Sequence, residues 1–455
     1  MKKAIVIFGA TGNLTYKKLL PALNVLINNK RINLDDKIFL VARKDLTLNE
    51  YIDDAKTQVS KYIDWDTLSN YLEYIKMEVE QTDSYGVLKD TLDSNGYSDT
   101  TFYLALPPEL FPIVSSGLNQ SGLVKKGEES KRIVFEKPFG QNLKTAEEIN
   151  RVLWKYFDES QIYRIDHYLG KEMIQNILIV RFANKIFEKT WNHNTIRSIV
   201  IKAKETEGIM NRGNYYDKIG ALKDMLQSHL LQMAALIGMT KPSSFKSEDI
   251  KNAKVRIFKD LEIDKNSVVL GQYKGYLEEK HVAKESKTET FVFAKANIKN
   301  NKWKNTPIYF ITGKKLDEKR SEIIINFNDD SQLQDMFLGA KKNNTKLIIK
   351  VAPEDGVLFQ LNVKQPGLSD DIISGNLDYC HTCNWVGNTP EAYEKLLLDI
   401  ISDNKTLFTR WDEIEAMWKI VDEINGDNLE RYIYSNYAHL RQMIKDSKGV
   451  DIDDL

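Results

Sequence analysis

Cysteine is scarce in this sequence: it occurs twice among 455 residues, so no disulfide framework can hold the fold together. An excess of charge of one sign is also missing, because 64 basic side chains are balanced by 65 acidic ones. A nucleic-acid-binding protein or a polybasic membrane binder normally carries a large excess of one sign. We therefore expect a cytoplasmic protein in a reducing compartment, with neither nucleic acid nor a membrane as partner.

Long hydrophobic runs are missing as well. The run over residues 4–10 is soon broken by Gly12 and Asn13, so it is too short and too polar for the core of a signal peptide. The longest later run, residues 230–239, contains Gln232 and is far shorter than the about 20 residues that a membrane-spanning helix needs. We expect no targeting segment and no membrane span.

The first third of the chain alternates apolar runs with helical patterns. Continuous apolar runs are typical of strands that are buried on both faces of a parallel sheet. They occupy residues 4–8, 37–41, 101–106 and 132–135, and residues 17–27 between the first two have the leucine spacing of a helix. This alternation predicts a doubly wound parallel sheet, an α/β Rossmann domain over residues 1–165.

The pattern changes after about residue 198. Apolar and polar residues then alternate, as they do in half-exposed antiparallel strands. The alternating segments are residues 199–204, 308–313, 322–327 and 345–351, and the region 391–444 is mostly helical by pattern. We predict that residues 166–455 form an α+β domain with a large, mainly antiparallel sheet.

A glycine-containing turn links the first strand to the first helix. It has the pattern Gly-x-x-Gly-x-Leu and contains Gly9, Ala10, Thr11, Gly12 and Leu14. Glycine lets the backbone approach a pyrophosphate, and the amides at a helix start favour its charge. The spacing departs from the common G-x-G-x-x-G fingerprint, so a tight turn without a ligand remains an alternative.

The second predicted strand ends in cations. Arg43 and Lys44 follow it, where an NAD enzyme would usually carry an acid on the ribose. Cations at this place suit the 2′-phosphate of NADP and favour that cofactor over NAD. The alternative is a pair of solvated surface side chains.

The segment over residues 164–172, RIDHYLGKE, precedes an apolar helical pattern. His167 and Lys171 are four residues apart, so in a helical turn they would share one face and could clamp a phosphate. An ordinary helix entry, with Asp166 as the N-cap and Lys171 in solvent, is the alternative.

A second titratable pair lies further on. Asp224 and His229 are five residues apart among apolar neighbours in a helical pattern. A histidine beside an apolar face is more often a satisfied core residue than a catalyst. Both interpretations remain open from these residues alone.

Taken together, these segments resemble the glucose-6-phosphate dehydrogenase family, from the first residues to at least Trp418. In chain order they are IFGATGNL from Ile7, FYLALPP from Phe102, VFEKPFG from Val134, RIDHYLGKE from Arg164, RFANKIFEKTWN from Arg181 and GALKDMLQSHLLQM from Gly220. RIDHYLGKE followed downstream by Asp-x-x-x-x-His is highly specific to that family.

The resemblance implies the first step of the oxidative pentose phosphate pathway. Glucose 6-phosphate would pass a hydride from C1 to C4 of the nicotinamide, which gives the 6-phospho-lactone and NADPH; NAD would be a weaker alternative cofactor. His229 would take the proton of the C1 hydroxyl, since imidazole titrates near neutrality. Asp166 would orient His229 and stabilise the imidazolium.

The resemblance also assigns binding residues and an assembly. For the sugar phosphate it implies Lys137, His167, Tyr168, Lys171, Glu205, Asp224, Lys314 and Lys319. For the cofactor it implies Gly9, Ala10, Thr11, Gly12, Leu14, Arg43, Tyr103 and Lys137, with Lys137 between cofactor and sugar. It assigns no metal, and it implies a homodimer, or a dimer of dimers, that forms through the large sheet.

Several positions depart from the family. Asn13 stands where the turn usually has Asp and Tyr16 where a basic residue is common, which predicts weaker or differently tuned cofactor binding. Ala352 stands where some relatives use Gln near the sugar, so a hydrogen bond would be lost or replaced by water. Cys380 and Cys383 have C-x-x-C spacing, but no second ligand pair is visible, and we expect free thiols in a loop.

Two other functions compete with this interpretation. A sugar oxidoreductase of the glucose–fructose oxidoreductase type also joins a Rossmann domain, a Glu-Lys-Pro turn and an open sheet. It does not require a phosphate clamp, so RIDHYLGKE argues against it. A catalytically silent NADP-sensing protein is the other competitor, and the presence of both Asp166 and His229 argues against that.

Overall fold

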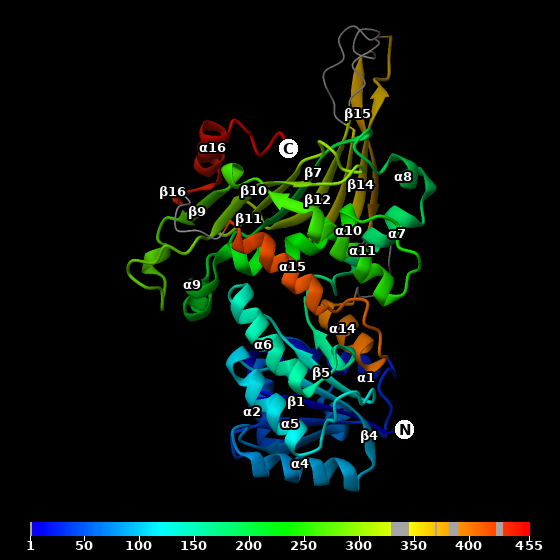
Figure 1. The fold of residues 1–455 in the computed structure, drawn as a ribbon, viewed down its shortest axis with the longest axis vertical. Coiled ribbons are helices and arrows are strands. Elements are labelled where there is room, and N and C mark those ends of the chain that lie inside the picture. Colours follow the sequence, from blue (N-terminus) through cyan, green and yellow to red (C-terminus); the bar gives the residue numbers. More distant parts are fainter. Residues whose placement is uncertain (1, 329–344, 369–370, 382–389, 425–430) are drawn as a thin grey trace. The chain divides into compact units, whose positions relative to one another are not determined.

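The computed structural model describes residues 2–328, 345–368, 371–381, 390–424 and 431–455 (Figure 1). Its contacts divide the chain into two compact units. The first comprises Met1–Gly170, Lys246–Lys251 and Pro390–Glu415, and the second comprises Lys171–Phe245, Asn252–Thr389 and Ala416–Leu455. The first unit therefore includes a late segment, 390–415, that the pattern of the sequence does not connect with the Rossmann domain.

The first unit contains a six-stranded, all-parallel sheet, which confirms the predicted Rossmann fold. Its strands are β1 Lys2–Phe8, β2 Lys37–Ala42, β3 Leu72–Lys76, β4 Tyr97–Leu104, β5 Lys131–Phe135 and β6 Ile162–Arg164. Their order is β3-β2-β1-β4-β5-β6, so the strand order reverses between β1 and β4. Ligands of such sheets bind beyond the carboxyl ends of the strands at this reversal, where the Gly9–Gly12 turn lies.

Except for α14, the helices of this unit lie between these strands along the chain. They are η1 Thr15–Leu19, α1 Leu20–Asn28, α2 Leu48–Gln58, α3 Trp65–Leu68, α4 Thr82–Ser94, α5 Phe111–Gln120, α6 Leu143–Tyr156 and, from the late segment, α14 Ala392–Ile401. The start of α2 is fixed by a capping box. The Thr47 hydroxyl accepts from the Glu50 amide, and the Glu50 carboxylate accepts from the Thr47 amide. η1 is a π-helix, with hydrogen bonds from residue i to i+5, and it follows the glycine turn directly.

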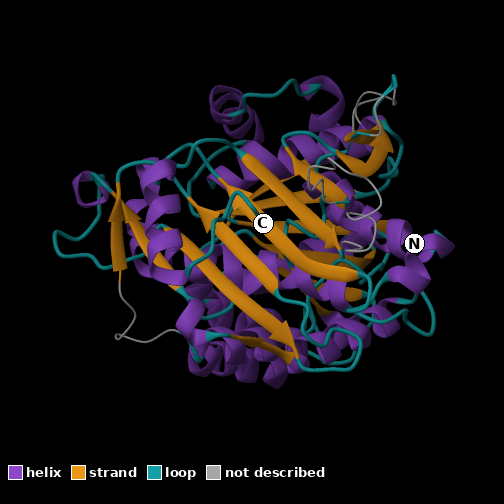
Figure 2. Ribbon diagram, turned by 90° about the horizontal axis from the view of Figure 1, so that it is seen from above, coloured by secondary structure: helices purple, strands orange, loops and turns teal. Residues whose placement is uncertain are grey.

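The second unit is built on a ten-stranded mixed sheet, which confirms the predicted large and mainly antiparallel sheet (Figure 2). Its strands are β7 Ile196–Lys204, β8 Leu261–Ile263, β9 Val269–Tyr273, β10 Phe291–Ile298, β11 Ile308–Gly313, β12 Arg320–Phe327, β13 Lys346–Ala352, β14 Gly356–Lys364, β15 Ile372–Cys380 and β16 Arg431–Tyr434. The order is β15-β14-β13-β12-β7-β11-β10-β9-β16, with β8 paired to β10. Among the described strands of this sheet, only the β7–β11 and β9–β16 pairs are parallel.

The helices that belong wholly or in part to the second unit include α10, which is apolar along most of its length. They are α7 Glu172–Phe182, α8 Lys185–Thr190, α9 Gly213–Ala221, η6 Leu222–Leu230, α10 Leu231–Gly238, α11 Ser247–Asp260, α15 Trp411–Asp422 and α16 Tyr437–Lys448. Every residue of α10 is buried, so the longest apolar run of the sequence is a core helix. None of the described helices has both the length and the apolar character that crossing a membrane requires.

The expectation of free thiols is wrong for one cysteine. Cys380, the last residue of β15, is disulfide-bonded. Cys383 lies outside the described residues.

A buried ion pair joins the end of β6 to the late segment of the first unit. The Arg164 guanidinium donates to Glu159 at 2.5 and 3.1 Å and to the Asn150 amide oxygen at 2.6 Å. The Trp411 amide donates to the same Glu159 carboxylate at 2.9 Å. Burial by itself raises the pKa of Glu159, but the charge and hydrogen bonds of Arg164 outweigh it and the pKa lies below its usual value.

Replacing Arg164 by Met should therefore destabilise the protein. It leaves a largely buried carboxylate without its cation, at a cost of about 3–5 kcal/mol in the free energy of unfolding, measured by urea titration. Because the folded pKa of Glu159 is depressed, this stabilisation is present above the unfolded pKa and is lost as the pH falls through the folded pKa. The difference between wild type and Arg164→Met should shrink accordingly in acid. Lys89→Met, which removes an exposed pair with Asp93, is the control and should change stability little; an equal loss in both variants would contradict the assignment.

Candidate active site

The glycine turn of the first unit is closed by close backbone contacts. Gly9 has a φ of +86°, and a Cβ at this position would lie 2.3 Å from the carbonyl oxygen of Ala105. The Gly9 carbonyl accepts from the Gly12 amide and from the Thr15 hydroxyl, both at 3.0 Å. Only glycine fits there, and the close approach of β1 to the end of β4 depends on it.

The cations after β2 differ in their surroundings. Arg43 is exposed, and no hydrogen bond or ion pair joins it to another described residue. The Lys44 ammonium, by contrast, lies 3.7 Å from the Asp54 carboxylate. Arg43 and the glycine turn together fit a dinucleotide, since Arg43 supplies a cation and Gly9 and Gly12 have no side chains that would keep a phosphate from the backbone.

Tyr16, where the family commonly has a cation, is buried in η1. Its phenol donates to Asp54 at 2.9 Å, and burial together with Asp54 raises its pKa. The residue is therefore neutral and bound to a neighbouring acid. It adds no positive charge to the turn.

The Glu-Lys-Pro turn after β5 carries a buried carboxyl that sequence reasoning did not select. Glu136 accepts from the phenol of Tyr103 at 2.5 Å and from the phenol of Tyr393, on α14, at 3.2 Å. Burial raises the pKa of Glu136 to about 7. The side chain of Tyr103 is itself buried and fixes the position of Glu136. Glu136 directly precedes Lys137, which is joined to Pro138 by a cis peptide bond. The partnership of Glu136 with Tyr393 has no signal in the sequence, because the two residues lie far apart along the chain.

The RIDHYLGKE segment forms a turn rather than the start of a helix. The Asp166 carboxylate accepts from the Tyr168 amide and its carbonyl accepts from the Leu169 amide, both at 3.0 Å. α7 begins only at Glu172, so neither a shared helical face for His167 and Lys171 nor an N-cap role for Asp166 is found. Asp166 is buried, and the His167 and Tyr168 rings lie 5.2 Å apart.

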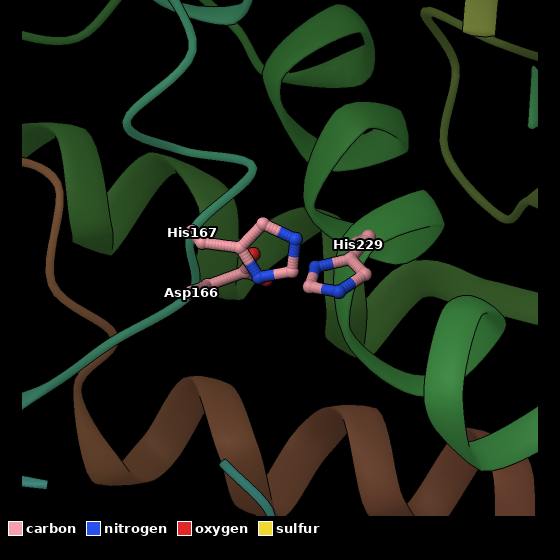
Figure 3. A group of neighbouring side chains, drawn as sticks. All are labelled: Asp166, His167 and His229. Carbon is pink, nitrogen blue, oxygen red and sulfur yellow. The ribbon is translucent and has the colours of Figure 1, made fainter. Parts of the chain in front are cut away.

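His229 and Asp224 lie on η6, a π-helix in the second unit. The His229 side chain is 1% exposed. Figure 3 draws His229 on this helix, and Asp166 and His167 on the segment that follows β6. In an α-helix residues three and four apart share a face, whereas turns with i→i+5 hydrogen bonds bring residues five apart to one side. Asp224 and His229 therefore project from the same side of η6.

Four predicted substrate residues meet in one charged cluster of the second unit. Lys314 is buried and pairs with the Glu205 carboxylate. Burial lowers the pKa of Lys171; Asp355 and Glu205 oppose this effect, and Lys319 adds to it. Lys171, Glu205, Lys314 and Lys319 thus share one electrostatic environment that holds more positive than negative charge.

Asp355 in this cluster was not expected from the sequence. It follows β13 after the cis bond between Ala352 and Pro353, and burial raises its pKa while the Lys171 charge opposes the rise. No motif contains it. The turn that places it beside Lys171 is visible only in the fold.

Two family models match the chain. The one described as the glucose-6-phosphate dehydrogenase NAD binding domain matches residues 6–176, and the one described as the C-terminal domain of the same enzyme matches residues 178–446. Together they support a nicotinamide cofactor and match the chain except for residues 1–5, 177 and 447–455.

Curated relatives extend over most of the chain. Glucose-6-phosphate 1-dehydrogenase from Bacillus subtilis is 38% identical over 93% of this chain and 91% of its own. The enzyme of the same name from Caenorhabditis elegans is 33% identical over 92% and 84%.

Solved structures agree with these matches. A glucose-6-phosphate dehydrogenase in complex with its substrate glucose 6-phosphate superposes with a TM-score of 0.89 at 31% identity, over 98% of this chain and 97% of the other. The enzyme from Mycobacterium avium has a TM-score of 0.84 at 31% identity, over 96% and 95%. A 3-ketoreductase from Actinomadura kijaniata, at 12% identity and a TM-score of 0.51 over 95% and 99%, shares the fold alone. Both family models, relatives above 30% identity over nine-tenths of the chain and the superposed structures all lead to one conclusion: the chain belongs to the glucose-6-phosphate dehydrogenase family.

Proposed function

We propose that this protein oxidises glucose 6-phosphate at C1, with NADP as the acceptor, to 6-phospho-D-glucono-1,5-lactone and NADPH in the cytoplasm, as the first step of the oxidative pentose phosphate pathway. The observation that carries the proposal is the charged cluster of Lys171, Glu205, Lys314 and Lys319 in a chain of this family. A dehydrogenase of unphosphorylated sugars needs no such cluster.

A steady-state assay tests the proposal directly. Reduction of each cofactor is followed by the ultraviolet absorbance of the reduced nicotinamide, with glucose 6-phosphate or free glucose as substrate. We expect turnover with glucose 6-phosphate and NADP to exceed every other combination. Equal rates with free glucose would favour the glucose–fructose oxidoreductase type instead.

The chain's own groups supply the proton chemistry. The nicotinamide, which the glycine turn and Arg43 would hold, would supply the hydride acceptor for C1. As the hydride leaves, the C1 hydroxyl loses its proton to His229, and the C1–O bond becomes the lactone carbonyl. Asp166 is the carboxylate partner that would fix the imidazole tautomer and stabilise the imidazolium.

The remaining predicted residues bind the two ligands in this proposal. His167, Tyr168 and Lys171, with Lys314 and Lys319, would hold the phosphate and neighbouring oxygens; Glu205 and Asp224 would accept from sugar hydroxyls. Gly9, Ala10, Thr11, Gly12 and Leu14 would cradle the pyrophosphate, Arg43 the 2′-phosphate, and Lys137 would lie between cofactor and sugar. Tyr103 would act through Glu136, to which its phenol donates.

We also propose that two copies associate through the large sheet, as a homodimer or a dimer of dimers. Exposed apolar side chains on its β14–β15 edge support this: Val363, Ile373, Leu377 and Tyr379. Val363 pairs with Ile373 in the β14–β15 register, and alternate residues of a strand share a face, so the four lie on one side of the two strands. An exposed apolar strip beside an edge strand is a typical association surface.

Replacing His229 by Asn should reduce turnover by roughly 10²–10⁴-fold, the usual contribution of a general base, with the affinity for the sugar nearly unchanged. Asp166→Asn should act in the same direction but less, because an amide still positions the ring. Steady-state kinetics with glucose 6-phosphate measures both. His439→Asn, at an exposed position on α16, is the control and should keep its kcat. An undiminished kcat in His229→Asn would show that another group is the base.

Replacing Arg43 by Ala should weaken NADP far more than NAD, because only NADP carries the 2′-phosphate that the guanidinium would pair. Titration of the protein with each cofactor measures the two dissociation constants. Lys44→Ala is the matched control and should have the smaller effect, since Lys44 is already paired with Asp54. The double variant tests whether Lys44 substitutes for Arg43. Equal weakening of both cofactors in the double variant would mean that these cations are structural.

Replacing Lys171 by Ala should reduce the apparent affinity for glucose 6-phosphate by tens- to hundreds-fold, on the order of one charged hydrogen bond lost in a closed site. Free glucose should hardly respond, because it has no phosphate to pair. The ratio of the two kcat/KM values is the quantity to measure. Lys315→Ala, which removes the exposed cation adjacent to Lys314 in the sequence, is the control. An unchanged ratio in Lys171→Ala would place the phosphate elsewhere.

A further inference from the structure

The helix that carries His229 changes its geometry along its length. η6, Leu222–Leu230, has i→i+5 hydrogen bonds, and α10, Leu231–Gly238, continues it with i→i+4 bonds. π-helical turns are rare and usually short, because an α-helix of the same residues is the ordinary alternative. In that alternative Asp224 and His229, which are five residues apart, would no longer lie on one side. Something outside η6 must therefore favour the wide turns.

The C-terminal end of this helix is held by side-chain donors. The last carbonyls of a helix have no partner within it and need one elsewhere. Here Arg181, Trp191 and Trp303 supply the partners, and all three come from outside the helix. Arg181 donates to the carbonyls of Leu236 and Met239 at 2.5 and 2.6 Å, Trp191 to that of Ile237 at 2.8 Å and Trp303 to that of Gly238 at 2.6 Å.

Arg181 is a buried cation, and no ion pair joins it to an acidic side chain in the part of the chain that the structure describes. Burial lowers its pKa to about 9, which still leaves it charged at neutral pH. The negative end of the helix dipole faces this charge, and the rings of Phe182 and Trp191 lie 4.5 and 5.2 Å from the guanidinium carbon. The end of the helix is thus the main electrostatic partner of Arg181.

The N-terminal end is held by a buried acidic side chain, and burial raises the pKa of Glu289. The Glu289 carboxylate is buried and accepts from the Leu222 amide at 3.0 Å, and its backbone carbonyl accepts from the Ala221 amide at 3.0 Å. Gly220 precedes them with a φ of +69°, and a Cβ there would lie 2.3 Å from the Glu289 carboxylate. A carboxyl group that accepts at the start and a cation that donates at the end thus supply partners for both ends of the helix.

We propose that Arg181 and Glu289 are positioning residues that clamp the helix from its two ends and so keep the wide turns that place His229 and Asp224 on one side. Trp191 and Trp303 complete the clamp at the α10 end. This inference rests on the proposed function, because it assigns the clamp to the geometry of His229 as the base. It gives the RFANKIFEKTWN segment, which contains Arg181 and Trp191, a role in the reaction without contact to substrate.

A double-mutant cycle with the full-length protein tests the clamp. Arg181→Met keeps the bulk of the side chain and removes both carbonyl partners. We expect kcat to fall by about tenfold to a hundredfold, the penalty of a displaced catalytic group, with the KM for glucose 6-phosphate changed much less. In the His229→Asn background the same substitution should cost almost nothing further, since the group that it positions is already missing.

A milder variant and a stability control complete the experiment. Trp303→Phe removes one N–H and keeps an aromatic ring, so it should show the same non-additivity with a smaller loss, and it decides the question if Arg181→Met does not fold. Ile444→Ala, in the buried cluster beneath α16, should lower the melting temperature while kcat stays unchanged. If Arg181→Met lowered kcat by the same factor in the wild type and in the His229→Asn background, the clamp would be overturned and the proposed function would stand. Absence of turnover in the wild type would overturn the proposed function, and the positioning role with it.

Discussion

The site of the second unit depends on the carbonyls at the end of α10, which have no hydrogen-bond donor within the helix itself. Four carbonyls buried in an apolar core need donors, and Arg181 with two indoles supplies them. Satisfying them fixes one end of the helix that carries His229 and explains a buried cation that makes no ion pair with an acid among the described residues. A π-helix also follows the glycine turn in the first unit, so both candidate ligand sites begin on wide helical turns.

Much of the fold could be predicted from the sequence, because strand patterns are local. The runs at 4–8, 37–41, 101–106 and 132–135 became β1, β2, β4 and β5, and the alternating segments became strands of the large sheet. The helical face that His167 and Lys171 would share in a helical turn is not found, since the Asp166 carboxylate accepts from the Tyr168 amide in a turn that precedes α7. The sequence could not distinguish a helical turn from the observed turn, because His167 and Lys171 are four residues apart in either case.

The residues of the candidate site also divide into those that could be predicted from the sequence and those that could not. Residues within motifs, such as Asp166, Lys171 and His229, could be selected from the sequence and its family resemblance. Asp355, Glu136 and Arg181 could not, because their importance depends on partners far away in the chain: Lys171, Tyr393 and the α10 carbonyls. A charge whose partner is a backbone carbonyl or a distant phenol leaves no pattern of spacing.

The return of the late segment 390–415 to the first unit sets an order of events during synthesis. Tyr163 of β6 is buried, its phenol donates to Asp403, and its ring packs against Phe408 at 4.9 Å. The Rossmann unit therefore cannot complete its core when its own strands leave the ribosome, although domains generally fold from the N-terminus as they emerge. Its last contacts wait until residues 390–415 have been translated, and a nascent chain that stops before α14 leaves Tyr163 without Asp403 and Phe408.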